Sequence, residues 1–240
     1  MLFGSLLAGL STGLGAVPLF FIKKLNHHLR DTLLAFTAGV MVSASTFSLI
    51  PEAKNYGLLP VFVGVFLGTN ILLLLEKTLP HIEIENFNQS LKGIDKKAWL
   101  IIAAIALHNI PEGLSVGVSY AADNPDLGSL VALAIGLQNA PEGLLVGLFV
   151  LQQNMSKGKA FAIALGTGFI EVISSIIGFI LIQYVTFFVP YGLAFAAGAM
   201  IYIVYKELIP ESHGHGYEIS ATIAFVNGLL IMFFLNEWFA

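Results

Sequence analysis

The sequence predicts an all-α polytopic membrane protein with eight transmembrane helices. Of the 240 residues, 57% are hydrophobic and only 11% are charged, whereas a soluble domain carries about 25% charged residues. The mean hydropathy is +0.85 over the whole chain. Such a value is typical of a chain that crosses the bilayer repeatedly, and not of a soluble domain with one anchor.

Eight apolar runs are each long enough to cross roughly 30 Å of hydrocarbon. We expect spans at 1–22, 32–51, 58–75, 98–121, 127–151, 160–184, 187–209 and 219–239. Lysines follow the first run and no basic residue precedes it, which is the reverse of a signal peptide, so we expect a retained span. The whole chain, 1–240, should form a single transmembrane domain.

The positive charges predict the orientation. Ten of the eleven basic residues fall in the odd-numbered loops or at their edge, and only Lys54 lies on the other side. By the positive-inside rule the odd loops are cytoplasmic, so both termini are extracytoplasmic. The loop at 77–97, between the third and fourth spans, is then cytoplasmic.

Other features of the composition exclude functions. There is no cysteine, so thiolate metal ligands are excluded, and a copper(I) carrier is disfavoured. The net charge is -4 with no basic face, which argues against nucleic acid as a partner.

Two internal repeats organise the chain. Residues 35–52 and 194–211 share nine of eighteen positions without a gap, at an offset of 159. These segments are the second and seventh spans, which cross the bilayer in opposite directions. Spans one to three and six to eight are therefore expected to form an inverted repeat, with spans four and five related by the same axis.

The second repeat is a hexapeptide in spans four and five. Residues 108–113 have the sequence HNIPEG and residues 138–143 have the sequence QNAPEG. Residues three and four apart share a helix face, so each copy presents an amide and a glutamate together. Pro111 and Pro141 cannot donate to the carbonyls four residues earlier, so we expect kinks there.

Three acids in these spans need a partner. An ionised carboxylate at the bilayer centre costs about 3 kcal/mol, so Glu112, Glu142 and Glu171 would together cost about 10 kcal/mol if unpaired. No lysine or arginine lies within spans four to six, which leaves a bound cation or an acquired proton. Taken one at a time, the polar residues of these spans also fit structural roles: a proline kink, an amide between helices, or a core histidine at His108.

This pattern resembles the ZIP (Zrt/Irt-like protein) family of divalent metal transporters, in its compact bacterial form. The resemblance covers essentially the whole chain. It implies a binuclear metal site at the midplane, in which Glu112 and Glu142 bridge two ions. The first ion would be completed by His108, Gln138 and Met41, and the second by Asn109, Asn139 and Glu171. Some relatives carry Asp where this chain has Asn139, and Met41 could equally be a packing residue.

The seventh span ends in a further cluster of polar residues. We expect a possible cytoplasmic exit route for metal at four residues: Glu207, Glu211, His213 and His215. Imidazole suits zinc and other transition metals, and carboxylates also accept manganese or cobalt.

The predicted function is therefore metal uptake into the cytoplasm by alternating access. The substrate would be zinc or another divalent transition metal (iron, cadmium, manganese or cobalt), with no organic cofactor. A metal-selective channel and an intramembrane metallohydrolase are the alternatives, although a single membrane histidine counts against an enzyme. The resemblance also implies a homodimer in the lipid bilayer, in a bacterial inner membrane.

Overall fold

The computed structural model describes residues 1–22, 25–78, 94–153 and 155–239, with the side chains of 78 and 94–106 outside this description. Regular structure in these residues is helical throughout. The long helices are α1 (Leu2–Gly15), α2 (His27–Ser43), α4 (Leu58–Thr78), α5 (Ile94–Ala121), α6 (Leu127–Gln152), α7 (Lys157–Tyr184), α8 (Val189–Ile203) and α10 (Glu218–Phe239). Short helical segments are η1 (Val17–Phe20), η2 (Ala44–Leu49), α3 (Ile50–Asn55), η4 (Thr186–Phe188), η5 (Val204–Leu208) and α9 (Ile209–Glu211).

The helices confirm an all-α integral membrane protein. Within the described residues, seven helical segments are long and apolar enough to cross a bilayer. The predicted fourth span lies in the 28-residue helix α5, and nearly half of its side chains fall outside the description. The count of eight spans therefore stays a prediction. Much of the predicted loop at 77–97 also lies outside the described residues.

Two helices begin earlier than their apolar runs. The α2 helix begins at His27 because the Asn26 side chain caps it, accepting a hydrogen bond of 2.8 Å from the Leu29 amide. The α7 helix begins at Lys157 with Ser156 as its cap. Polar N-caps satisfy amides that have no partner within the helix. Hydropathy does not report caps, so these helices extend beyond the apolar runs that start at 32 and 160.

The helix widens at two places outside the hexapeptides, and the kinks predicted at Pro111 and Pro141 stay a prediction. Pro111 and Pro141 lie inside continuous helices. The helix widens into π-helical turns at η2 and η5, each immediately before an Ile-Pro-Glu sequence. A proline cannot donate to the preceding turn and its ring crowds that turn's carbonyl, so a widened turn accommodates it. The two π segments occupy equivalent positions in the repeat of residues 35–52 and 194–211.

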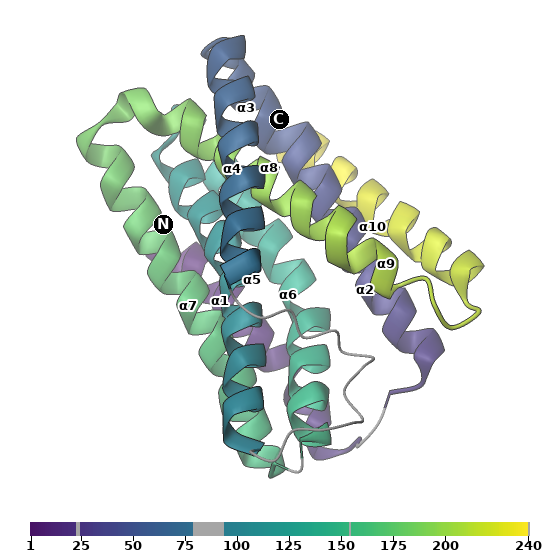
Figure 1. The fold of residues 1–240 in the computed structure, drawn as a ribbon. Helices are drawn as coiled ribbons and strands as arrows, with labels where there is room; N and C mark the ends of the chain where they lie inside the picture. Colours follow the sequence, from purple (N-terminus) through teal and green to yellow (C-terminus); the bar gives the residue numbers. More distant parts are fainter. Residues whose placement is uncertain (23–24, 79–93, 154, 240) are drawn as a thin grey trace.

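The helices pack as two groups. In one group α1, α5, α6 and α7 contact one another, and in the other α2 packs along α10 and α4 along α8. Contacts of α5 with α8 and of α2 with α6 join the groups. In Figure 1, α2 and α10 run together along one edge of the molecule and α7 lies at the opposite edge. We call these the α5–α6 bundle and the α2–α8 group.

Glycines allow close crossings that recur in pairs. A Cβ at Gly68 would lie 2.1 Å from the carbonyl oxygen of Phe195, and one at Gly228 would lie 2.3 Å from that of Phe36. Phe36 and Phe195 are 159 residues apart, which is the offset of the sequence repeat. The carbonyls met at the α4–α8 and α2–α10 crossings are thus equivalent in the repeat, while the two glycines are 160 residues apart.

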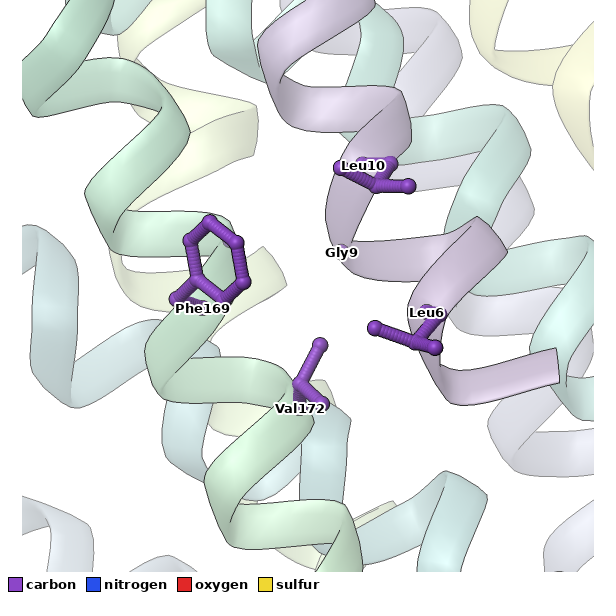
Figure 2. A pocket seen from close by; sticks show the side chains of 6 residues that line it. Leu6, Gly9, Leu10, Phe169 and Val172 are labelled. Atoms are coloured by element: carbon purple, nitrogen blue, oxygen red, sulfur yellow. The ribbon is translucent and has the colours of Figure 1, made fainter. Parts of the chain in front are cut away.

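The α1–α7 crossing is also built on glycines. A Cβ at Gly9 would lie 2.5 Å from the Gly168 carbonyl oxygen, and one at Gly168 would lie 2.1 Å from that of Gly9. These two residues are again 159 apart. Figure 2 shows the shallow groove beside them, flanked by Leu6, Leu10 and Phe169. The groove has no room for a water molecule, so the helices are in close contact there.

The two ends of the molecule are distinguished by the loops that meet there. At one end, the Lys157 Nζ donates to the Phe20 carbonyl (2.7 Å) and His28 lies 3.0 Å from the Ser220 hydroxyl. At the other end, the Tyr56 hydroxyl donates to Asp123 (2.7 Å), and its partial burial together with this bond raises the pKa of Tyr56 to about 12. Contacts at one end thus join odd-numbered loops, and contacts at the other end join even-numbered loops. Which end faces the cytoplasm stays a prediction.

Candidate metal site

The two hexapeptides lie on α5 and α6, which pack against each other inside the α5–α6 bundle. Asn109, Gln138 and Asn139 are fully buried and Glu112 is only 2% exposed. Glu171, on α7, is 1% exposed. Carboxylates and amides are rarely buried unless they are paired. Their partners therefore decide what the site can do.

Glu112 is held across the interface between the two repeat helices. The Gln138 side-chain amide donates to Glu112 Oε1 at 2.5 Å. This bond uses one oxygen of the carboxylate and one N–H of the amide. The second carboxylate oxygen of Glu112 and the amide oxygen of Gln138 have no hydrogen-bond partner within the described residues.

The asparagines fix the flanking helices. Asn139 donates to the Ala8 carbonyl of α1 (2.9 Å) and to the carboxylate of Glu171 (2.5 Å). Asn109 donates to the Thr167 carbonyl of α7 (3.2 Å). Each asparagine therefore binds a backbone carbonyl with its N–H group, which fixes the orientation of its amide oxygen.

Glu142 is the third acid of the cluster. It is partly exposed and lies within range of electrostatic interaction with Glu112, Glu171 and His108. None of these three glutamates forms an ion pair with a lysine or arginine within the described residues. A bound cation or an acquired proton is thus left to neutralise these carboxylates.

Unpaired buried oxygens are the strongest chemical signal in the site. Ten side-chain oxygens are buried without a hydrogen-bond partner in the part of the chain that the structure describes, and five of them are hydroxyls. The other five belong to predicted site residues: Asn109 Oδ1, Glu112 Oε2, Gln138 Oε1, Asn139 Oδ1 and Glu171 Oε1. An unsatisfied buried polar group costs about 1–3 kcal/mol, and more when it is charged. All five atoms have lone pairs that are available to a cation.

His108 joins the site to the second helix group. Its Nε2 lies 3.2 Å from Glu207 Oε1 on η5, and the two side chains are 24% and 27% exposed. The predicted metal ligand is therefore adjacent to a predicted exit residue. This contact crosses from the α5–α6 bundle to the α2–α8 group.

Comparisons with known proteins decide the family. Residues 83–236 match the family described as ZIP zinc transporter. The chain is 37% identical to the zinc transporter GufA of Myxococcus xanthus over 98% of this chain and 97% of that protein. The chain belongs to the ZIP family. It is therefore a membrane transporter and not an enzyme, as the sequence predicted.

Two further bacterial relatives cover nearly the whole chain. The zinc transporter ZIPB of Bordetella bronchiseptica is 33% identical over 94% of this chain and 77% of its own length. The zinc transporter ZupT of Chlorobaculum parvum is 33% identical over 95% of this chain and 93% of its own. The compact bacterial type expected from the sequence is confirmed.

Not every predicted ligand of this ZIP family member is brought into contact with the others. In the described residues, no three His, Asp or Glu side chains are disposed to hold a metal ion as they stand. The Gln138 and Asn139 amides bond one oxygen each of Glu112 and Glu171, while His108 contacts Glu207. The predicted ligand atoms are neighbours, but they do not converge on one metal position.

Met41 lies in the apolar core. It is 2% exposed and belongs to the same buried cluster as its repeat mate Met200. Packing accounts for the burial of both methionines, so a role of Met41 as a ligand stays a prediction.

The four predicted exit residues separate into distinct contacts. Glu207 pairs with His108, and Glu211 lies 3.4 Å from Arg30. His213 lies 3.0 Å from the carbonyl of Ile209, within its own segment. His215 Nδ1 lies instead 3.1 Å from Asp31 Oδ1.

Two residues of this region were not predicted. Asp31 is fully buried beside His215, whose ring stacks on that of His27 with 4.1 Å between the ring centres. It is the only acid in the first 51 residues, a signal that could have singled it out. Glu76, on α4, accepts a hydrogen bond from Tyr202 and lies 3.9 Å from Lys206.

Proposed function

We propose that this ZIP family member carries divalent transition-metal ions, zinc foremost, across the membrane into the cytoplasm. The observation that carries the proposal is the set of five unpaired buried oxygens on α5, α6 and α7. Three relatives that match nearly the whole chain are named zinc transporters, which supports zinc as the substrate. The mixture of carboxylate, amide and imidazole also suits a borderline metal better than calcium or magnesium.

We place two metal positions in the site. Glu142 interacts electrostatically with both Glu112 and Glu171. It is therefore suited, together with Glu112, to bridge the two metal ions. His108, Gln138 and Met41 complete the first position. Asn109, Asn139 and Glu171 complete the second. Two divalent ions offset the three carboxylate charges, which otherwise cost about 3 kcal/mol each in the bilayer.

Binding would proceed by exchange of hydrogen bonds for metal bonds. Gln138 already presents a free amide oxygen beside the free oxygen of Glu112. Asn139 and Glu171 present a second such pair. A metal entering the cluster exchanges its water for these oxygens, and His108 leaves Glu207 to complete the first position.

Alternating access is supported by the paired contacts. The carbonyls of Phe36 and Phe195, which Gly228 and Gly68 approach, are separated by the offset of the repeat, and so are the reciprocal glycines Gly9 and Gly168. Such pairing is expected of an inverted repeat of spans one to three and six to eight, a common plan in transporters that expose a midplane site alternately. The α5–α6 bundle would move against the α2–α8 group.

Burial on either side of the site favours a state open toward the cytoplasm. On the outer side, Val116 of α5 and Val131 and Ile135 of α6 are fully buried in one apolar cluster. On the inner side, His108, Glu142 and Glu207 are partly exposed. We infer that the outer half is sealed and that metal leaves past Glu207. The orientation, the homodimer and the bacterial inner membrane stay predictions.

Uptake into proteoliposomes tests the function. Zinc uptake should saturate with concentration, and cadmium, iron, manganese and cobalt should compete with it in proportion to their affinity for the site. Flux that rises linearly with concentration would favour a metal-selective channel. No uptake of any of these metals above that of protein-free liposomes would overturn the proposal.

Glu207→Gln tests the exit route. Replacing the carboxylate removes the anionic partner of His108 and of a departing ion, so we expect the maximal zinc uptake rate to fall about tenfold. Zinc affinity of the purified protein should change little, because Glu207 is outside the two metal positions. Glu218→Gln, which alters an exposed glutamate at the start of α10, is the matched control. An unchanged rate in Glu207→Gln would remove Glu207 from the route.

A further inference from the structure

Thr12 on α1 is a buried polar residue that the proposed metal positions do not use. It is 0% exposed, and its hydroxyl oxygen has no hydrogen-bond partner within the described residues. A threonine hydroxyl in a helix usually binds a carbonyl of the preceding turn, as Thr46 does with Val42 (2.7 Å). An unpaired hydroxyl in this location therefore needs a reason.

The contacts of α1 and α7 with the hexapeptides are equivalent. Asn139 donates to the Ala8 carbonyl, and Asn109 donates to the Thr167 carbonyl. The two asparagines are 30 residues apart, as the hexapeptides are, and the two carbonyls are 159 apart. The helix α1 thus lies against α6 as α7 lies against α5.

One turn further along, the same equivalence pairs Thr12 with Glu171. A Cβ at Gly143 would lie 1.8 Å from the Thr12 carbonyl oxygen, and one at Gly113 would lie 2.2 Å from the Glu171 carbonyl oxygen. Thr12 and Glu171 are again 159 apart. Thr12 therefore takes, beside the second hexapeptide, the place that Glu171 takes beside the first.

The position of the hydroxyl agrees with this pairing. A Cβ at Gly168 would lie 3.1 Å from Thr12 Oγ1, so the hydroxyl lies against α7 at Gly168. Gly168 and Glu171 are three residues apart and share a helix face. The Thr12 hydroxyl is thus within about one helical turn of residue Glu171, on the facing helix.

We propose that Thr12 is a further cation-binding residue of the metal site, where its hydroxyl oxygen is the counterpart of the Glu171 carboxylate. This rests on the proposed metal site. A threonine side chain is shorter than that of glutamate, so its oxygen binds the ion through a metal-bound water. The two halves of the pseudo-symmetric site then differ in one respect: an acid stands in one half and a neutral hydroxyl in the other.

Thr12→Val tests this, since valine has the shape of threonine without the hydroxyl. We expect the zinc affinity of the purified protein, measured by calorimetry, to fall about fivefold. Thr12→Ser, which retains the hydroxyl, should stay within about twofold of the unaltered protein. Ser11→Ala is the matched control, because the Ser11 hydroxyl donates to the Leu7 carbonyl of its own helix (2.8 Å). Should the valine variant fail to fold, Thr12→Ala gives the same readout.

Zinc affinity in Thr12→Val equal to that of the unaltered protein would overturn the role of Thr12. Glu112→Ala in the same assay separates the two proposals. If Glu112→Ala loses zinc binding while Thr12→Val retains it, only the role of Thr12 is wrong. If both bind zinc normally, the metal site itself is wrong.

Discussion

Glu142→Ala is expected to lower zinc uptake into proteoliposomes about 100-fold or more, because it removes a carboxylate proposed to bind both ions. Glu142 is the residue whose charge interacts with Glu112, Glu171 and His108. Glu112→Ala should have an effect of the same size.

The loss has to be separated from misfolding. Glu142 is partly exposed, and its side chain holds no other helix in place through an ion pair with lysine or arginine within the described residues. Glu142→Ala should therefore leave the thermal unfolding temperature of the detergent-purified protein nearly unchanged. Glu237→Ala, at an exposed glutamate near the end of α10, is the control for removal of a carboxylate. Uptake by Glu142→Ala at the rate of the unaltered protein would contradict the assignment of the site.

Gly143→Ala is expected to destabilise the protein by about 3 kcal/mol or to prevent its folding. An added Cβ would lie 1.8 Å from the Thr12 carbonyl oxygen, and this neighbour is backbone, which cannot rotate away. The helices α1 and α6 would have to separate, which would also pull the Ala8 carbonyl from Asn139. Thermal unfolding in detergent measures the effect.

Gly166→Ala is the matched control. Gly166 is also inside a long membrane helix, α7, but an added Cβ there meets nothing within 4 Å. Alanine is favoured over glycine in helices by up to about 1 kcal/mol, so the control should be as stable as the unaltered protein or slightly more stable. Equal unfolding temperatures for the two variants would show that α1 and α6 are not in the close contact described.

Several parts of the site follow from local sequence. Long apolar runs predict membrane helices because hydropathy is a property of a segment on its own. The HNIPEG and QNAPEG sequences place their polar residues on one helix face by helical spacing alone. The family resemblance drawn from these motifs was confirmed by relatives that match nearly the whole chain.

Other parts depend on which helices meet. Asn139 binds a carbonyl 131 residues away, and His215 contacts an acid 184 residues away. Neither partner has a periodicity or a motif that marks it. The π-helical turns before Pro51 and Pro210 show the same limit, because the proline pattern alone did not predict them. Local steric rules identify where a helix is able to deform, and the packing of the helices determines at which of these positions it deforms.

The sequence by itself determined the membrane class, the repeats and the chemical types of the ligand residues, because these depend on composition and spacing. Only the tertiary structure decided that His108 contacts Glu207, that Asn109 and Asn139 bind equivalent carbonyls, and that Thr12 faces the turn before Glu171. Such pairings arise from the close approach of distant helices at glycines, and this approach is a property of the packed bundle and not of any single helix.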